Sequence, residues 1–504
     1  MEVGAELSFA WGMMRLVLGR VLPLILAEDA DVLVVHKPSG INTHKPDRFA
    51  PDGLHEWLLK RGWKLSILHR LDKETSGVLV FGKSMQANQA LTRQFTQHKI
   101  KKEYLFLSTS RPKRHRFCEE GPNEQTWFEY VAPVGENHLI KAEPVTGKTH
   151  QIRRHAATCR FPVLGDSKYG DTPAPRLMLH AHRITFVHPA TNEPVTYTAS
   201  IPAVFEDLEP LTAAREFREL LFDPVETNAF RLVSGVADGL PGVIVDDYAG
   251  CLFAQRLTET SVLPPLNGAA VYEQLATKQS RSAPVCTAGE PVSGRFPVRE
   301  NGLTFLIGFG EGLSTGIFLD QRENRRRLLQ MPLVGKRVLN CFAYTCAFSV
   351  AAAKAGAVTT SVDLSRNYLE WGKENFRANE LDPEKHDFVF GDVFEWLKKF
   401  AKRGDRWDVV LLDPPTFATT KKGRSFRAER DYAELAVLAA PLVAPGGTLF
   451  CSSNQRTLTP ENFERAIRAA GRAITALEFA TVPFDYRLAE GERPYLKTWW
   501  ATLE

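Results

Sequence analysis

The sequence predicts two folds in one chain: an α+β domain built on a mixed sheet, followed by an α/β domain built on a parallel, doubly wound sheet. The 504 residues exceed what one ordinary hydrophobic core holds, so two or more domains are expected. Between residues 20 and 200, short strand-like runs with Pro and Gly turns surround one helical pattern, "MQANQALTRQFTQHK". From about residue 335, apolar runs such as "RVLNCF", "WDVVLLD" and "GTLFCSS" alternate with helical patterns, which indicates βαβ units.

The change between the two patterns falls at a charged amphipathic segment, "EDLEPLTAAREFRELL", which we interpret as a linker helix. The predicted segments are a lead-in at 1–20, a first domain at 21–206, the linker helix at 207–224, a small α+β subdomain at 225–310 and the doubly wound domain at 311–504.

Composition is typical of a soluble globular protein, with 44% hydrophobic and 24% charged residues and no apolar run long enough to span a bilayer. The seven cysteines are irregularly spaced and form no CxxC pair, which argues against a zinc site and a disulfide framework. Charges interrupt the apolar run near the N-terminus, unlike in a signal sequence. We therefore expect a cytoplasmic protein without a metal or a membrane partner, and a monomer, with a dimer as the alternative.

The net charge of +4 is only a weak indication of a nucleic-acid partner, whereas local clusters of cations say more. Compact cationic stretches occur at 98–104, 111–116, 322–327 and 421–427. Such runs either track RNA phosphates or form solvated surface, and the sequence alone leaves both readings open.

One carboxylate in the first half, Asp72, stands among polar and cationic residues in "LHRLDKETSGVLVFGKS". An Asp in such a turn is most often structural, because it bonds its own backbone. Three later stretches change this reading: "EPVTGKTHQIRRHAA" (143–157), "PVLGDSKYGD" (162–171) and "RLMLHAHRITFVHP" (176–189). In this order and spacing, residues 22–205 resemble the RluA-type pseudouridine synthases, which isomerise uridine in RNA.

The resemblance implies three catalytic residues: Asp72, Tyr104 and Arg153. The carboxylate can act on the sugar or on the base, and both routes stay open. A planar guanidinium can orient that carboxylate and keep it ionised, and a tyrosine ring offers a flat face to a flipped-out uracil. The resemblance also implies substrate contacts for Arg70 and His150, and no cofactor for this half.

The segment "VLNCFAYTCAFSVAAAKAGAVTTSVDLS" (338–365) has the layout of a cofactor-binding strand, loop and helix. Asp363 closes the second strand, where a carboxylate can accept both hydroxyls of a ribose. Asp392 and Asp413 end the next two strands, so the three carboxylates should meet at one crevice. A nicotinamide site would look similar, but Asp-Pro-Pro at 413–415 favours a site whose extended backbone accepts the amino group of a base.

Three stretches extend the pattern: "ETNAFRLVSGVADGLPGVIVDDYAG" (226–250), "LSTGIFLDQRENRR" (313–326) and "PYLKTWWATL" near the end. With them, residues 220–504 resemble the RlmI/RlmK-type ribosomal RNA methyltransferases. The implied fold is a Rossmann-like class I methyltransferase domain with a small α+β subdomain before it, and the implied cofactor is S-adenosylmethionine. The implied donor-binding residues are Phe318, Asp320, Gln321, Arg322, Phe342, Tyr344, Thr345, Asp363, Asp392 and Asp413.

The donor loop departs from this family. Relatives commonly have Tyr-Thr-Gly-Gly or Tyr-Thr-Gly-Ser, where this chain has Tyr344, Thr345, Cys346 and Ala347. Because a Cβ restricts how closely a backbone approaches a ligand, we expect weakened donor affinity.

The methyl acceptor depends on one position. Methylation of cytosine carbon 5 requires a cysteine thiolate that first attacks carbon 6. In "PGGTLFCSSNQR", Asn454 stands where cytosine-directed relatives have that cysteine, and Cys451 is predicted to be a core residue. The arrangement "DPPTF…SSNQR" resembles the branch that methylates guanine nitrogen 7, whose lone pair needs positioning and no base. The residues predicted to hold the base are Pro414, Pro415, Thr416, Phe417 and Asn454.

We therefore expect a bifunctional RNA-modifying enzyme that acts on ribosomal RNA, with transfer RNA as the alternative. The competing hypotheses are that the methyltransferase-like half only binds RNA, that it methylates cytosine carbon 5, or that it methylates a small molecule or a protein.

Overall fold

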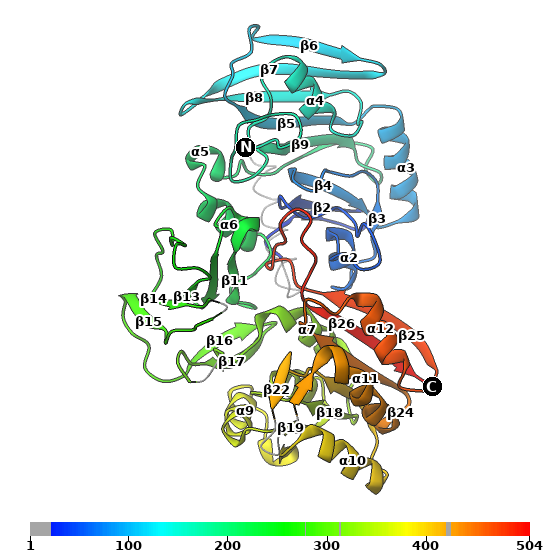
Figure 1. The fold of residues 1–504 in the computed structure, drawn as a ribbon. Helices are drawn as coiled ribbons and strands as arrows, with labels where there is room; N and C mark the ends of the chain where they lie inside the picture. Colours follow the sequence, from blue (N-terminus) through cyan, green and yellow to red (C-terminus); the bar gives the residue numbers. More distant parts are fainter. Residues whose placement is uncertain (1–21, 278, 312–313, 420–424) are drawn as a thin grey trace. The chain divides into compact units, whose positions relative to one another are not determined.

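The computed structural model describes residues 22–277, 279–311, 314–419 and 425–504 (Figure 1). The predicted lead-in at 1–20 and residues 421–424 of the last cationic stretch lie outside these residues. The chain divides into two compact units. Unit 1 comprises Met1–Pro46, Asp52–Asp223 and Gly235–Pro241, and unit 2 comprises Asp47–Pro51, Pro224–Ser234 and Gly242–Glu504.

Unit 1 is built on one ten-stranded mixed sheet with the order β1-β2-β4-β9-β5-β8-β7-β6, in which β3 pairs with β4 and β10 with β9. Only β4 and β9 pair in parallel. The strands are β1 (Ile25–Glu28), β2 (Val32–Lys37), β3 (Ser66–Ile67), β4 (Ser76–Gly82), β5 (Lys101–Ser108), β6 (Arg116–Gly121), β7 (Glu124–Val134), β8 (Asn137–Pro144), β9 (Leu179–Val187) and β10 (Pro194–Thr198). The helices are α2 (Leu54–Leu59), α3 (Met85–Thr96), α4 (Gln151–Thr158), α5 (Val204–Asp207) and α6 (Pro210–Glu219).

The central strands of this sheet are apolar because both of their faces are covered. Every residue of β2 and β4 is buried, and Leu91 of α3 packs against them. Ile152 of α4 packs in a second cluster with Phe106 and Phe128. The segment that we interpreted as a linker contains α6, which lies in unit 1, where Arg218 forms a buried ion pair with Asp238 at 2.7 Å.

Unit 2 begins with a five-stranded sheet, β11-β12-β13-β14-β15, and a β16–β17 hairpin. A seven-stranded sheet follows, in the order β20-β19-β18-β21-β24-β26-β25, and β22 and β23 form a further hairpin. The first strands are β11 (Ala229–Ser234), β12 (Val243–Tyr248), β13 (Cys251–Arg256), β14 (Ala270–Leu275), β15 (Val285–Gly289), β16 (Phe296–Glu300) and β17 (Leu303–Ile307). The others are β18 (Arg337–Cys341), β19 (Val358–Asp363), β20 (Asp387–Phe390), β21 (Trp407–Leu412), β22 (Phe417–Thr419), β23 (Ser425–Arg427), β24 (Val443–Ser453), β25 (Ile474–Thr481) and β26 (Lys497–Leu503).

The helices of unit 2 cover both faces of the seven-stranded sheet. They are α7 (Arg322–Gln330), α8 (Ala347–Lys354), α9 (Arg366–Ala378), α10 (Val393–Arg403), α11 (Ala428–Ala439) and α12 (Pro460–Arg468). One apolar cluster includes Leu328, Val350 and Leu369 from α7, α8 and α9, and another includes Leu397 and Leu435 from α10 and α11.

Strands β20, β19, β18, β21 and β24 are parallel, whereas β26 runs antiparallel between β24 and β25. The chain order reverses at β18, so the carboxyl ends of β18 and β21 form a topological switch point, where open α/β sheets bind ligands. The predicted fold class, a mixed-sheet domain followed by a doubly wound one, is confirmed. None of the described helices combines the length and the apolar character that crossing a membrane requires.

Candidate active sites

The loop that carries Asp72 lies between β3 and β4 and is held by polar contacts with the loop after β2. The Lys37 ammonium, which is fully buried, donates to the Lys73 carbonyl at 2.9 Å and to two carbonyls of its own loop at 2.8 Å. The Ser39 hydroxyl donates to the Glu74 carbonyl at 2.7 Å. These bonds fix the backbone on which the Asp72 carboxylate is presented.

Tyr104 reaches the same site from β5. The pairing of β5 with β9 shifts register between Glu103 and Tyr104, and such a bulge re-aims the side chain that follows it. Burial, with the nearby Asp72 charge, raises the pKa of Tyr104, so its phenol stays protonated at neutral pH. Tyr104 is therefore suited to stacking and to hydrogen bonding in its neutral form.

Arg153 projects from the first turn of α4, and its principal partner is a carboxylate that the sequence did not single out. Its Nε and Nη2 atoms donate to the two carboxylate oxygens of Asp166, both at 2.6 Å, while Nη1 lies 3.9 Å from Asp72 Oδ2. Burial opposes the charge of Arg153, but Asp166 and Asp72 raise its pKa above the usual value. Asp166 thus orients the guanidinium, which in turn lies beside Asp72.

His150 precedes α4 in a left-handed conformation, with φ of 55°. Its Nε2 atom lies 3.7 Å from Asp72 Oδ2, and its Nδ1 atom lies 3.2 Å from the hydroxyl of Tyr169. Burial lowers the pKa of His150, Arg153 and Lys168 lower it further, and Asp72 opposes this effect. The imidazole is thus neutral at physiological pH and borders the carboxylate. The "GDSKYG" stretch of the sequence contains Asp166 and Tyr169, but it did not indicate which residues these two side chains contact.

A cleft of about 880 Å³ opens over Asp72 and Tyr104. A smaller pocket that shares Asp72 and Tyr104 with this cleft brings together the five residues that the sequence assigned to this half: Arg70, Asp72, Tyr104, His150 and Arg153. Among the described residues that line the cleft, Asp72 is the only carboxylate, and the cations are Arg70, Lys73, Lys102 and Lys148. Such a lining attracts a polyanion.

In unit 2, Asp363 at the end of β19 has the geometry of a ribose acceptor. Its two oxygens accept the backbone N–H groups of Tyr344 and Ser365, each at 2.8 Å, which orients the carboxylate and leaves further lone pairs. Beside it, Leu364 and Phe390 are 43% and 42% exposed, although they are apolar. Exposed apolar side chains next to a fixed carboxylate fit an adenosine group, and sequence reasoning missed these two residues.

The donor loop after β18 has positive φ angles, which favour glycine, at three positions where this chain has other residues. Phe342, Tyr344 and Cys346 have φ of 62°, 50° and 62°, a region that bulky residues rarely adopt. The Cys346 side chain is fully buried, and a Cβ added to Gly372 would lie 2.5 Å from its sulfur. Gly372 therefore makes room for the cysteine. Thr345 is also fully buried and donates to the Gly316 carbonyl at 2.6 Å.

The residues of the "FLDQR" segment (318–322) differ in their exposure and in their hydrogen-bond partners. Phe318 is 48% exposed, and Asp320 accepts a hydrogen bond from Tyr495 at 2.7 Å. Gln321 is buried and donates to Asp413 at 3.0 Å and to Ser452 at 2.8 Å. Gln321 thus connects the ends of β21 and β24.

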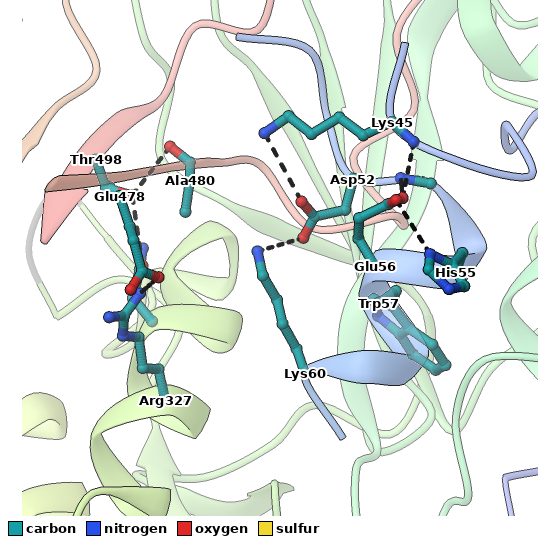
Figure 2. A network of polar contacts seen from close by, with 12 residues as sticks. Lys45, Asp52, His55, Glu56, Trp57, Lys60, Arg327, Glu478, Ala480 and Thr498 are labelled. Atoms are coloured by element: carbon teal, nitrogen blue, oxygen red, sulfur yellow. Dashed lines mark hydrogen bonds and ion pairs between the residues drawn. The ribbon is translucent and has the colours of Figure 1, made fainter. Parts of the chain in front are cut away.

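Arg322 is buried and forms an ion pair with Asp485. Arg325 is likewise buried, with two hydrogen bonds of 2.7 Å to Glu300, and Arg327 pairs with Glu478 at 2.7 Å (Figure 2). The idea that 322–327 tracks phosphates or forms solvated surface is therefore wrong for Arg322 and Arg325, because both are neutralised inside the unit. A contribution of Arg322 to donor binding stays a prediction.

Asp413, at the end of β21, is the most perturbed carboxylate of the crevice. Burial raises its pKa to about 6, the Asp320 charge adds to this effect, and hydrogen bonds from Ser452 and Gln321 oppose it. Asp392, after β20, accepts the Phe394 backbone N–H at 2.8 Å and caps α10. Asp392 and Asp363 stand at the ends of the adjacent strands β20 and β19, whereas Asp413 follows β21, which β18 separates from β19. That the three carboxylates share one ligand stays a prediction.

Two of the predicted acceptor residues, Thr416 and Asn454, are in contact after the ends of β21 and β24. The Thr416 hydroxyl donates to the Asn454 side-chain oxygen at 2.5 Å. Pro414 is buried, Pro415 is exposed, and the side chain of Phe417 lies outside the described part of the structure. Cys451 is fully buried in β24, and burial raises the pKa of its thiol.

Two family models match the chain. Residues 31–158 match RNA pseudouridylate synthase, and residues 256–485 match S-adenosylmethionine-dependent methyltransferase. YwbD of Bacillus subtilis is 37% identical over 319 residues, which cover 58% of this chain and 78% of that protein. Ribosomal RNA large subunit methyltransferase I of Cronobacter sakazakii is 34% identical over 291 residues, 53% of this chain and 72% of that protein.

Among solved structures, SMU.776 complexed with SAH has 26% sequence identity and a TM-score of 0.53, and the match covers 63% of this chain and 87% of that one. The matched residues of the first family model lie in unit 1 except for Asp47–Pro51, and those of the second lie in unit 2. The chain therefore joins an RluA-type RNA pseudouridine synthase domain to a C-terminal half that belongs to the RlmI/RlmK-type family of S-adenosylmethionine-dependent methyltransferases.

Proposed function

We propose that the protein modifies ribosomal RNA in two ways in the cytoplasm: unit 1 isomerises uridine and unit 2 methylates nitrogen 7 of guanine. The name of the Cronobacter sakazakii relative supports a ribosomal substrate. The single observation that carries the choice of acceptor is the hydrogen bond between Thr416 and Asn454, because by the family resemblance Asn454 stands where carbon-5 chemistry needs a thiol.

In unit 1, isomerisation breaks the bond between C1′ and N1 of the uridine and forms one between C1′ and C5. The C5 hydrogen leaves as a proton and N1 gains one, so no redox cofactor is needed. Asp72 is the group that acts on the sugar or on the base, and Arg153 and His150 border it at 3.9 and 3.7 Å. Tyr104 supplies the ring against which the base stacks.

In unit 2, the residues fit a nucleoside with a charged tail. Asp363 would hold the ribose hydroxyls, Leu364 and Phe390 would flank the adenine, and Asp413 would face the cationic end of the donor. When S-adenosylmethionine is bound, it supplies an electrophilic methyl group. The backbone of the donor loop already has the conformation that glycine would adopt.

The acceptor base would be held by Thr416 and Asn454 after β21 and β24. Guanine N7 carries an in-plane lone pair that is unprotonated at neutral pH, so alignment suffices for methyl transfer. Carbon 5 of cytosine requires a thiolate, whereas Cys451 is fully buried and burial raises the pKa of its thiol. These two facts favour guanine.

The test uses total RNA from cells that lack the gene, incubated with purified protein and tritiated S-adenosylmethionine, then digested to nucleosides for mass spectrometry. We expect 7-methylguanosine, lost with Asn454→Ala and retained with the matched Cys451→Ala variant. The appearance of 5-methylcytidine, or a loss of transfer with Cys451→Ala alone, would contradict guanine as the acceptor. Asp72→Asn should abolish new pseudouridine and leave methylation unchanged.

A second candidate function is favoured by one observation, the Cys346–Ala347 sequence in the donor loop. If the loop excludes the donor, unit 2 would only bind RNA. Titration calorimetry with S-adenosylhomocysteine decides between the two: measurable heat that disappears in Asp363→Ala supports the methyltransferase, and no heat supports the binding role.

A further inference from the structure

The cleft over Asp72 is larger than one uracil requires. The pocket that contains Asp72, His150 and Arg153 has a volume of about 90 Å³, whereas the adjoining cleft has a volume of about 880 Å³. The cleft extends from Asp72 and Tyr104 to residues of the loops after β2 and α3. A cleft of this size accommodates a ligand well beyond a single base.

The lining of this cleft includes two flat aromatic rings, those of His69 and Phe95. His69 and Phe95 stack with their ring centroids 4.6 Å apart and 29° between the ring planes. Burial, with the Lys102 charge, lowers the pKa of His69 to about 3, so the ring is neutral. Ile67, which is 37% exposed, and His98, which is also exposed, line the same cleft. Unpaired RNA bases stack on such surfaces.

The same wall contains two polar side chains, Asn42 and His44. The Nδ1 atom of His44 is buried and has no hydrogen-bond partner among the described residues. This atom is covered by protein, but His44 is only half-buried, so other parts of its ring border the cleft. Asn42 also lines the cleft and is half-buried, so its side-chain amide offers a base both a donor and an acceptor.

This wall is rigid. Glu56 of α2 accepts the backbone N–H groups of Lys45 at 2.7 Å and of Gly53 at 3.0 Å (Figure 2). Asp52 pairs with Lys60 at 2.6 Å and lies 3.9 Å from the Lys45 ammonium. A Cβ added to Gly53 would lie 2.3 Å from the His44 backbone, so the two segments are in close contact. The position of His44 is therefore set before any ligand binds.

We propose that the part of the cleft lined by Asn42, His44, His69, Phe95 and His98 is a second base subsite, which binds an unpaired nucleotide adjacent to the target uridine. The stacked pair offers a flat neutral surface, and Asn42 and His44 read the edge of the base. The cations of the cleft contact the phosphates between the two nucleotides. The subsite makes the enzyme selective for the sequence around the uridine, and it builds on the isomerase activity of the same cleft.

The first experiment measures pseudouridine formation in total RNA from cells that lack the gene, by chemical mapping at each uridine. We compare wild type with His44→Leu and Phe95→Leu, and with Gln86→Leu as a matched control, because Gln86 is exposed on α3, the helix that carries Phe95, and lies outside the cleft. We expect kcat/KM at the native uridine to fall about tenfold in the two cleft variants through KM, with kcat within twofold. The control should match wild type.

The second experiment uses a fragment around the mapped uridine in which each flanking nucleotide in turn is made abasic. One abasic position should lower kcat/KM of wild type about tenfold and have no further effect on His44→Leu, since the contact is already lost. Equal effects in both proteins, or cleft variants that modify the same uridines at wild-type kcat/KM, would refute the subsite. If wild type forms no pseudouridine in the first experiment, the isomerase activity itself fails, a distinct result that removes the subsite with it.

Discussion

Asp166 accepts hydrogen bonds from the Nε and Nη2 atoms of Arg153, both at 2.6 Å, while Asp72, the proposed catalytic carboxylate, lies 3.9 Å from Nη1 of the same guanidinium. The buried Asp166 carboxylate therefore orients the Arg153 guanidinium, whose Nη1 atom remains available to Asp72. Although burial alone would raise it, the pKa of Asp166 is lowered by Arg153 and by two backbone N–H groups, so the pair is ionised at neutral pH.

The first prediction concerns this orientation. Asp166→Asn keeps the size of the side chain but removes its charge, so the guanidinium loses its fixed direction. We expect kcat for pseudouridine formation to fall by about 100-fold with little change in KM, because small misplacements of a catalytic contact have effects of this order. Single-turnover kinetics on RNA measures this. An unchanged kcat would show that Arg153 needs no support from Asp166.

The second prediction concerns pH and the methyl donor. Because the pKa of Asp413 is raised to about 6, this carboxyl is neutral below that pH and charged above it. We expect affinity for S-adenosylmethionine, whose reacting end is cationic, to rise about tenfold between pH 5 and 7.5. Calorimetry across this range measures the effect, and Asp413→Asn should abolish the pH dependence.

The same group affects stability with a definite sign. Its pKa is raised on folding, so the folded chain binds this proton more tightly than the unfolded chain. The stabilisation is fully present below the unfolded pKa and is lost as pH rises through about 6. The free energy of unfolding of wild type and of Asp413→Asn is measured with denaturant at pH 4.5 and 7.5. The stability of wild type relative to Asp413→Asn should fall from pH 4.5 to pH 7.5. An equal difference at both pH values would contradict the raised pKa.

The third prediction concerns the cysteine in the donor loop. Gly372→Ala would place a Cβ 2.5 Å from the Cys346 sulfur, so we expect a loss of about 1–3 kcal/mol in the free energy of unfolding. Adding Cys346→Gly should restore most of it, because the space is vacated. Chemical denaturation of the two single variants and the double variant measures the coupling, and additive losses would show that the contact is unimportant.

The fourth prediction concerns Lys37. Lys37→Met would remove a donor from three carbonyl oxygens of the loops at the Asp72 site, of which the Lys73 carbonyl keeps the Gly40 N–H at 2.8 Å, so we expect unfolding to require about 2–4 kcal/mol less free energy. Pseudouridine formation should fall, because Asp72 sits on one of these loops. Methyl transfer by the same preparation is the internal control, and Lys336→Met, at an exposed ion pair, is the matched variant that should change little.

Much of both sites follows from local sequence. Asp72, Tyr104 and Arg153 stand in short motifs, and Asp363, Asp392 and Asp413 follow strands whose alternation with helices shows that they are parallel. The carboxyl ends of parallel strands meet at one edge of a sheet, so their proximity is a consequence of chain order.

Tertiary structure alone decided which partner each residue has. The bulge that aims Tyr104, the clamp of Asp166 on Arg153, the burial of Arg322 and Arg325, and the space that Gly372 leaves for Cys346 each join segments distant in the chain. Residue type and spacing determined the chemistry that this protein carries, because they are properties of short segments. The orientation, charge and accessibility of those groups depend on contacts formed only when the strands and helices pack together, and no local pattern encodes them.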